Sequence, residues 1–138
     1  MKRISVLVVL SVVLLAVSLS CGKGEASDAG KVVMPVSVDA MLQDAGKFKL
    51  TVIELGSTGC RPCQMMTPVL EALAREYKGR VRVVFFDVWQ DQTPARHYAI
   101  RVIPVQVVID GTGKEVYRHE GYIPEEELKK VIDGLLKQ

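Results

Sequence analysis

The segment Cys60-Arg61-Pro62-Cys63 holds two cysteines separated by two residues, a spacing that permits three kinds of chemistry. The pair can form a structural disulfide, bind a metal ion, or cycle between a dithiol and a disulfide. A disulfide across so short a loop restricts the unfolded chain little, so its stabilising effect through loop entropy is small. The residues around the pair therefore have to indicate which chemistry applies.

The flanking sequence places the pair where a strand turns into a helix. The apolar run from Leu50 to Leu55 predicts a strand, and residues 56–59 predict a turn. Beyond it, apolar side chains recur at the three- and four-residue spacing of one helix face, and they are Met66, Val69, Leu70, Leu73, Ala74 and Tyr77. A helix N-terminus stabilises a thiolate through its unpaired N–H groups and its dipole. The position favours a redox-active Cys60–Cys63 disulfide that needs no further cofactor.

The first 20 residues predict an export signal. A basic start, Met1-Lys2-Arg3, precedes an almost wholly apolar stretch over residues 4–19, and small polar residues follow. The stretch is somewhat short for a membrane-spanning helix, which needs about 20 residues. An uncleaved membrane anchor is the alternative.

Cys21 stands directly after this apolar stretch. Its setting resembles the bacterial lipoprotein signal, in which the cysteine is lipidated and becomes the mature N-terminus. The commonest form of that signal differs at Ser18, where leucine is usual, and at Leu19, where a small residue is usual. The resemblance implies a lipid anchor at Cys21 that holds the protein at a membrane surface. Signal cleavage nearby, with Cys21 as a bystander, is the alternative.

The charge of the chain is balanced once the leader is set aside. The 138 residues contain 18 basic and 16 acidic residues, and the leader removes Lys2 and Arg3 but no acid. Sixteen of each sign then remain, and this balance does not indicate a nucleic-acid partner. We expect a flexible tether over residues 21–31 and one domain over residues 32–138.

The domain alternates between strand-like and helix-like segments. The predicted strands are 32–36, 50–55, 81–88, 105–109 and 115–119, and the predicted helices are 39–45, 63–77, 93–99 and a last one opened by Pro124. Strands joined through helices imply parallel neighbours, and the turn at residues 110–113 adds an antiparallel hairpin. The sum predicts an α/β fold, with a mixed central sheet and helices on both faces.

These features together resemble the thioredoxin superfamily. The matching features are a C-x-x-C pair after a strand, Pro68 five residues beyond Cys63, a segment ending in Ile103-Pro104, and Gly121 after the hairpin. The resemblance covers residues 32–138. It implies a thioredoxin-like fold, thiol–disulfide exchange, and a cis Pro104 that packs against the cysteines.

Two departures accompany the resemblance. Gly59 stands where thioredoxins usually carry a tryptophan, and Arg61 stands where glycine is usual. Together with the leader, these departures point to the exported, membrane-tethered thiol–disulfide proteins of bacteria. Such proteins often receive electrons from a membrane thiol transporter, which implies a membrane electron donor here.

The resemblance assigns roles to the active segment. Cys60 is the expected nucleophile, and Cys63, one helical turn on, is the expected resolving thiol. Arg61 places a positive charge beside the thiolate, which tunes the redox chemistry unless the side chain only projects into solvent. Pro62 sets φ in the first helical turn, where its missing N–H costs nothing.

Three further residues complete the candidate site. Glu54 is an acid within an apolar strand, where the family often has a buried carboxylate. Burial raises the pKa of a carboxyl, so Glu54 is a candidate to exchange a proton with Cys63. The alternatives are an exposed acid or a lysine pair. A cis bend at Ile103-Pro104 implies backbone pairing with an extended substrate.

The leading hypothesis is an exported, lipid-tethered thiol–disulfide oxidoreductase, with the reductase direction favoured and protein disulfides as substrates. The alternative from another class is a copper or zinc carrier that binds through Cys60 and Cys63. Such sites need further ligands, and His97 and His119 are the nearest candidates. A redox-inert peptide-binding module is a third hypothesis. Trp89 receives no role from the sequence alone.

Overall fold

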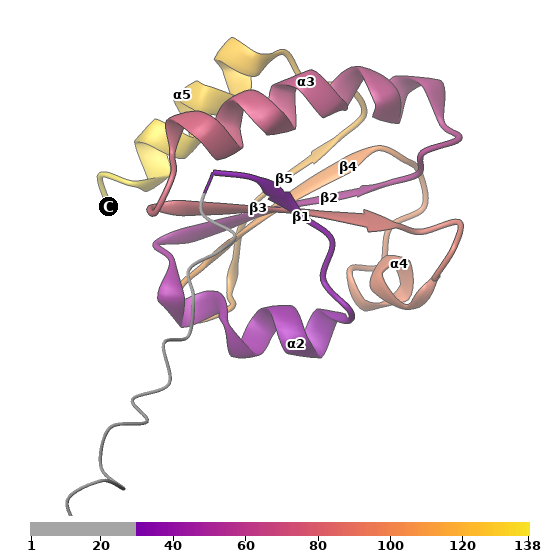
Figure 1. Ribbon diagram of the computed structural model, residues 1–138, viewed down its shortest axis with the longest axis horizontal. Coiled ribbons are helices and arrows are strands. Elements are labelled where there is room, and N and C mark those ends of the chain that lie inside the picture. The colour runs from indigo at the N-terminus through magenta and orange to yellow at the C-terminus, as the bar shows by residue number, and fades with distance from the viewer. Residues whose placement is uncertain (1–29) are drawn as a thin grey trace, which may run out of the picture.

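The computed structural model describes residues 30–138, and Figure 1 shows their arrangement. The predicted signal, the lipidation site Cys21 and most of the predicted tether lie outside the described residues. Across residues 30–138, no helix combines the length and the apolar character that a membrane crossing requires.

A five-stranded mixed sheet forms the centre of the domain. Its spatial order is β1 (Val32–Val33), β3 (Val81–Asp87), β2 (Leu50–Gly56), β4 (Val105–Asp110) and β5 (Glu115–Glu120). β3 pairs in parallel with β1 and β2, while β4 pairs antiparallel with both β2 and β5. The predicted mixed sheet, with parallel strands and a final hairpin, is confirmed.

Helices cover both faces of this sheet, as predicted. One face carries α3 (Arg61–Glu76) and α5 (Glu125–Leu135), and the other carries α2 (Val38–Gln43), the 3-10 helix η1 (Ala45–Lys47) and α4 (Thr93–His97) (Figure 1). Successive strand residues point to opposite faces. Accordingly Val52 packs in the cluster beneath α3, and Ile53 packs in the cluster on the α2 side.

Some predicted boundaries shift by a few residues. The helix after the cysteines begins at Arg61 rather than Cys63, because Cys60 already acts as its N-cap. β1 covers two residues rather than five, and α2 ends at Gln43, before η1. The apolar runs themselves lie where the sequence predicted them.

All seven residues of β2 are buried. A central strand of a sheet covered on both faces is expected to be apolar throughout. Glu54 breaks that expectation in the middle of β2, and Gln106 breaks it on the neighbouring β4. Both lie close to the end of the sheet where α3 begins.

Candidate active site

Cys60 and Cys63 form a disulfide at the N-terminus of α3, with their Cα atoms 5.2 Å apart. The backbone N–H of Cys63 donates to the Cys60 sulfur at 3.4 Å, so Cys60 caps the helix with its own side chain. Cys60 is 8% exposed and Cys63 is 3% exposed. Cys60 is therefore the more exposed member of the pair, as predicted, and it occupies the end of the helix where a negative charge is favoured.

Arg61 and Pro62 occupy the first helical turn between the two cysteines, and both are exposed. Arg61 makes no ion pair with any residue in the described part of the chain. Its charge therefore stays available next to Cys60, although solvent screens it.

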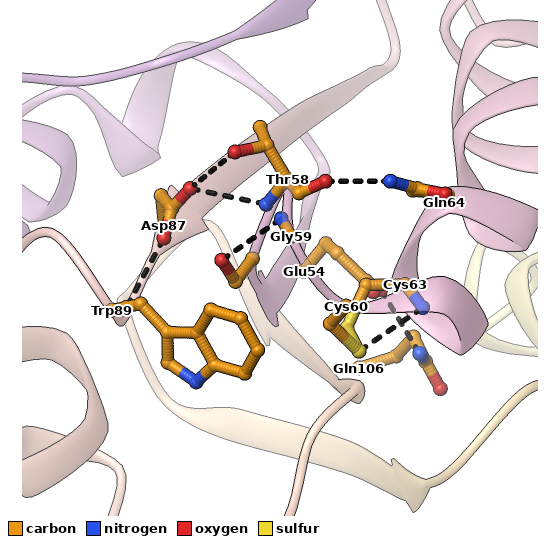
Figure 2. The surroundings of a disulfide bond; sticks show 10 residues. Glu54, Thr58, Gly59, Cys60, Cys63, Gln64, Asp87, Trp89 and Gln106 are labelled. Carbon is orange, nitrogen blue, oxygen red and sulfur yellow. Dashed lines mark hydrogen bonds between the residues drawn. A yellow bond between two sulfur atoms is a disulfide. The ribbon is translucent and has the colours of Figure 1, made fainter.

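Asp87, the last residue of β3, anchors the loop that leads into Cys60. Its carboxylate accepts hydrogen bonds from the Thr58 backbone N–H at 3.1 Å, from the Thr58 hydroxyl at 3.0 Å, and from the Trp89 backbone N–H at 3.1 Å (Figure 2). Burial alone would raise the pKa of Asp87, but these bonds outweigh it and hold the pKa below its usual value. The ionised carboxylate thus ties the β2–α3 loop to the β3–α4 connection.

Trp89 supplies an aromatic ring next to Gly59, the residue before Cys60. A Cβ atom built on Gly59 would lie 2.8 Å from Cζ3 of Trp89, so the indole occupies the space that a side chain at residue 59 would need (Figure 2). The ring is still 65% exposed. Sequence reasoning gave Trp89 no role, because this contact joins residues 30 positions apart. The unusual glycine before Cys60 was the available signal.

A groove of about 550 Å³ lies beside Trp89. Its walls include Trp89, Val102 and Ile103, and two arginines, Arg96 and Arg101, also line it. The Ile103–Pro104 peptide bond is cis, as the family resemblance implied. The groove therefore joins the indole to the residue before the cis-proline, and its lining mixes apolar side chains with Gln92 and the two arginines.

Glu54 is fully buried, as predicted. Burial raises the pKa of its carboxyl to about 8, although a hydrogen bond from Gln106 acts in the opposite direction. That bond runs from Nε2 of Gln106 to Oε2 of Glu54 at 2.9 Å. The alternative hypotheses of an exposed acid and of a lysine pair are therefore wrong. Gln106 is a residue that sequence reasoning missed.

The register of β2 places Glu54 on the same face as the cysteines. Gly56 follows two residues after Glu54, so both point toward α3. A Cβ atom on Gly56 would lie 3.2 Å from Cβ of Cys63 and 3.3 Å from its sulfur. Cys63 thus packs on β2 one step beyond Glu54, and Figure 2 shows the carboxyl, Gln106 and the disulfide gathered at this point.

The predicted alternative ligands lie elsewhere. His97 is exposed on α4, and His119 lies on β5 with Nε2 3.4 Å from the backbone oxygen of Tyr122. Within residues 30–138, no group of three or more His, Cys, Asp or Glu side chains is placed to hold a metal ion.

Comparison with known proteins agrees with this geometry. The family model described as Thioredoxin matches residues 32–134. Thioredoxin from Staphylococcus aureus is 34% identical over 95 residues, which cover 69% of this chain and 90% of that protein. The chain belongs to the thioredoxin family, and its Cys60–Cys63 pair makes it a thiol–disulfide oxidoreductase.

Solved structures support the fold independently. Chloroplastic thioredoxin z superposes with a TM-score of 0.69 at 26% identity, covering 78% of this chain and 96% of that one. Thioredoxin from Trypanosoma brucei brucei gives a TM-score of 0.72 at 18% identity, covering 83% of this chain and 98% of that one. The family implies protein disulfides as the substrates and the protein's own disulfide as the reacting group.

Proposed function

We propose that this protein is an exported, lipid-anchored reductase of protein disulfides. Cys60 is its nucleophile, Cys63 its resolving thiol, and Glu54 its internal proton acceptor. The observation that carries the proposal is the buried Glu54 carboxyl, which lies on the α3-facing side of β2, two residues before the Gly56 against which the disulfide-bonded Cys63 packs.

The first step uses the reduced form of Cys60. Its sulfur already receives a hydrogen bond from the Cys63 backbone N–H in the disulfide form, and the same donor and the helix dipole stabilise a thiolate. This thiolate attacks one sulfur of a substrate disulfide. The substrate S–S bond breaks, its electron pair leaves on the second substrate sulfur, and a mixed disulfide joins Cys60 to the substrate.

The second step uses Cys63 and Glu54. The Glu54 carboxylate takes the proton from the Cys63 thiol, and the Cys63 sulfur attacks the Cys60 sulfur. The bond between Cys60 and the substrate breaks, and the substrate leaves as its second thiolate. Burial raises the pKa of Glu54 to about 8, close to that of a thiol, so the proton transfer between them costs little.

Substrate docking involves the groove between Trp89 and Ile103. An extended substrate segment pairs with the backbone at Ile103, next to Pro104, as an added strand. The exposed Trp89 ring then covers the apolar side chains that flank the substrate cysteine. Pro62 fixes the turn that presents Cys60, and Arg61 adds a positive charge beside the thiolate.

Export and anchoring rest on the leader. The basic start, the apolar stretch and Cys21 support lipidation, which would hold the domain at the extracytoplasmic side of a bacterial membrane. A membrane thiol-electron donor then keeps Cys60 and Cys63 reduced. Cells expressing the Cys21→Ser variant are expected to release the protein from the membrane fraction. Unchanged membrane retention would contradict lipidation and favour an uncleaved anchor.

The direction of electron flow has its own test. Acid quenching of cells followed by thiol alkylation measures the fraction of protein with reduced Cys60 and Cys63. A reductase is held mostly reduced by its donor, whereas an oxidase is held mostly as the disulfide. An oxidised steady state would reverse the proposed direction, in line with the charge of Arg61.

Trapping tests the nucleophile and names the substrates. The Cys63→Ala variant lacks the resolving thiol, so it should accumulate mixed disulfides through Cys60 that mass spectrometry identifies. The matched control carries Cys60→Ala instead and should trap little, because the remaining cysteine is the less exposed of the two. Equal trapping by both variants would refute the assignment of Cys60 as nucleophile.

A further inference from the structure

Gln106 lies directly opposite Glu54 on β4, and it has no role in the two exchange steps of the proposed function. The Cα register pairs the two residues across the antiparallel strands β2 and β4. Both side chains have 0% exposure, in a part of the sheet whose other residues are almost all apolar. Burying polar groups costs free energy unless they are hydrogen-bonded. The burial of this polar pair in the sheet therefore needs an explanation.

The pair leaves two oxygens without partners. Nε2 of Gln106 donates to Oε2 of Glu54 at 2.9 Å. Among the described residues, neither Oε1 of Glu54 nor Oε1 of Gln106 has a hydrogen-bond partner. These are the two atoms that a second hydrogen bond between the same groups would join once the carboxyl gains a proton.

A glutamine side chain suits both protonation states of a carboxyl. A carboxylate only accepts hydrogen bonds, and the Gln106 amide N–H meets that need. A protonated carboxyl also carries an O–H donor, for which the Gln106 amide oxygen is an acceptor. An apolar residue at 106 would serve neither state.

Few other charged side chains face Glu54 from the helices and strands around it. β3 places Phe85 opposite it, and Asp87 two residues further on is engaged by Thr58 and Trp89. α3 contributes Cys63, which packs against Gly56, two residues further along β2. On β5, His119 is the register partner of Gln106 and lies one strand beyond the carboxyl. Gln106 is thus the side chain in direct polar contact with Glu54.

Building on the proposed proton role of Glu54, we propose that Gln106 is the positioning residue that holds this carboxyl beside Cys63 while the proton moves between them. Before resolution, the Gln106 N–H binds the Glu54 carboxylate. The carboxylate takes the Cys63 proton, the Cys63 sulfur bonds to the Cys60 sulfur, and the substrate leaves with the electron pair of the broken S–S bond. The new O–H of Glu54 then donates a hydrogen bond to the Gln106 amide oxygen. It points away from the Cys63 sulfur, which is now part of the disulfide.

The test is the pH dependence of resolution in the Gln106→Met variant. Mixing reduced protein with an aromatic disulfide that releases a coloured thiolate separates the two steps by stopped flow. The first burst reports attack by Cys60, and the second reports resolution by Cys63. The wild-type second phase should accelerate with pH as Glu54 ionises. Loss of the hydrogen bond to the carboxylate should move this acceleration about one pH unit higher, with the first phase unchanged.

Two comparisons make the result specific. Thr51→Val removes a buried hydroxyl on the opposite face of β2 that also lacks a partner among the described residues, and it should not move the profile. In a Glu54→Gln background, adding Gln106→Met should change nothing further. If Gln106→Met does not fold, Gln106→Asn shortens the amide by one methylene and should shift the profile in the same direction.

The outcomes separate the two proposals. An unshifted second phase in a folded Gln106 variant, together with a slow second phase in Glu54→Gln, overturns the role of Gln106 and leaves Glu54 in place. A second phase of Glu54→Gln that matches wild type removes the proton role of Glu54, and the role of Gln106 with it. Absence of a second thiolate release from wild-type protein refutes the dithiol mechanism itself.

Discussion

Replacing Glu54 with glutamine should change how the stability of the oxidised protein depends on pH. The Glu54 carboxyl has a pKa of about 8 in the folded chain, because it is buried, against an ordinary value of 4.5. Glutamine has nearly the same shape, cannot ionise, and can still accept the hydrogen bond from Gln106. The variant therefore isolates the cost of ionising a buried carboxyl.

The sign and the size follow from proton linkage. Between pH 4.5 and about 8, the folded protein holds a proton on Glu54 that the unfolded chain has released. The stability that the Glu54 carboxyl contributes is fully present below pH 4.5, the ordinary pKa. It is lost as the pH rises through the folded pKa of about 8. The loss is about 1.4 kcal/mol for each pH unit in this interval, or about 5 kcal/mol in total. The Glu54→Gln variant should not show this loss of stability.

Urea unfolding of wild-type and variant protein, at about pH 5.5, 6.5 and 7.5, measures the effect as a difference of unfolding free energies. The variant should gain about 3 kcal/mol relative to wild type between the first and last pH, since contributions from all other groups cancel. The control is Glu71→Gln, which makes the same substitution at an exposed acid of α3 whose ion pair with Arg75 is screened by solvent. A flat difference for Glu54→Gln would refute the buried, protonated carboxyl.

Three further changes test the surroundings of the site. Asp87→Asn should lower the free energy of unfolding in urea by about 1–3 kcal/mol, because the hydrogen bonds that hold Thr58 and Trp89 lose their charged acceptor. Gly59→Ala should displace the indole of Trp89, the chain's one tryptophan, and shift its fluorescence while the melting temperature changes little; an unchanged spectrum would contradict the close contact. Tyr77→Phe should lower the free energy of unfolding by about 1 kcal/mol in the same urea assay, since the Tyr77 hydroxyl donates to a carboxylate of α5 at 2.9 Å. An unchanged free energy of unfolding would show that this hydrogen bond does not stabilise the fold.

The sequence predicted the fold well because the fold depends on local patterns. The apolar run that became β2 and the helical spacing that became α3 each carry their signal within a few residues. The start of α3 was placed two residues late. Cys60 acts as an N-cap through its sulfur, and capping statistics favour Ser, Thr, Asp and Asn for that place.

The candidate site residues were also predictable, since Cys60 and Cys63 lie in one short motif and Glu54 is a conspicuous acid in an apolar strand. Gln106 was not predictable in the same way. A polar residue in the run 105–109 marks a solvent-facing position as readily as a buried one. Only the pairing of β4 with β2 places it opposite Glu54, and that register depends on contacts 52 residues apart in the chain.

Trp89 and Gly59 show why a single departure from a family pattern is weak grounds for expecting a different site. The sequence has Gly59 where thioredoxins usually carry a tryptophan. In the folded chain, the indole of Trp89 reaches the space beside Gly59 from the β3–α4 connection, and Asp87 accepts hydrogen bonds from Thr58 and from the Trp89 backbone on either side of this contact. Glycine at 59 makes room for this ring, because a Cβ atom there would lie 2.8 Å from Cζ3 of the indole. The two positions should therefore vary together, and a bulky residue at 59 requires a smaller one at 89.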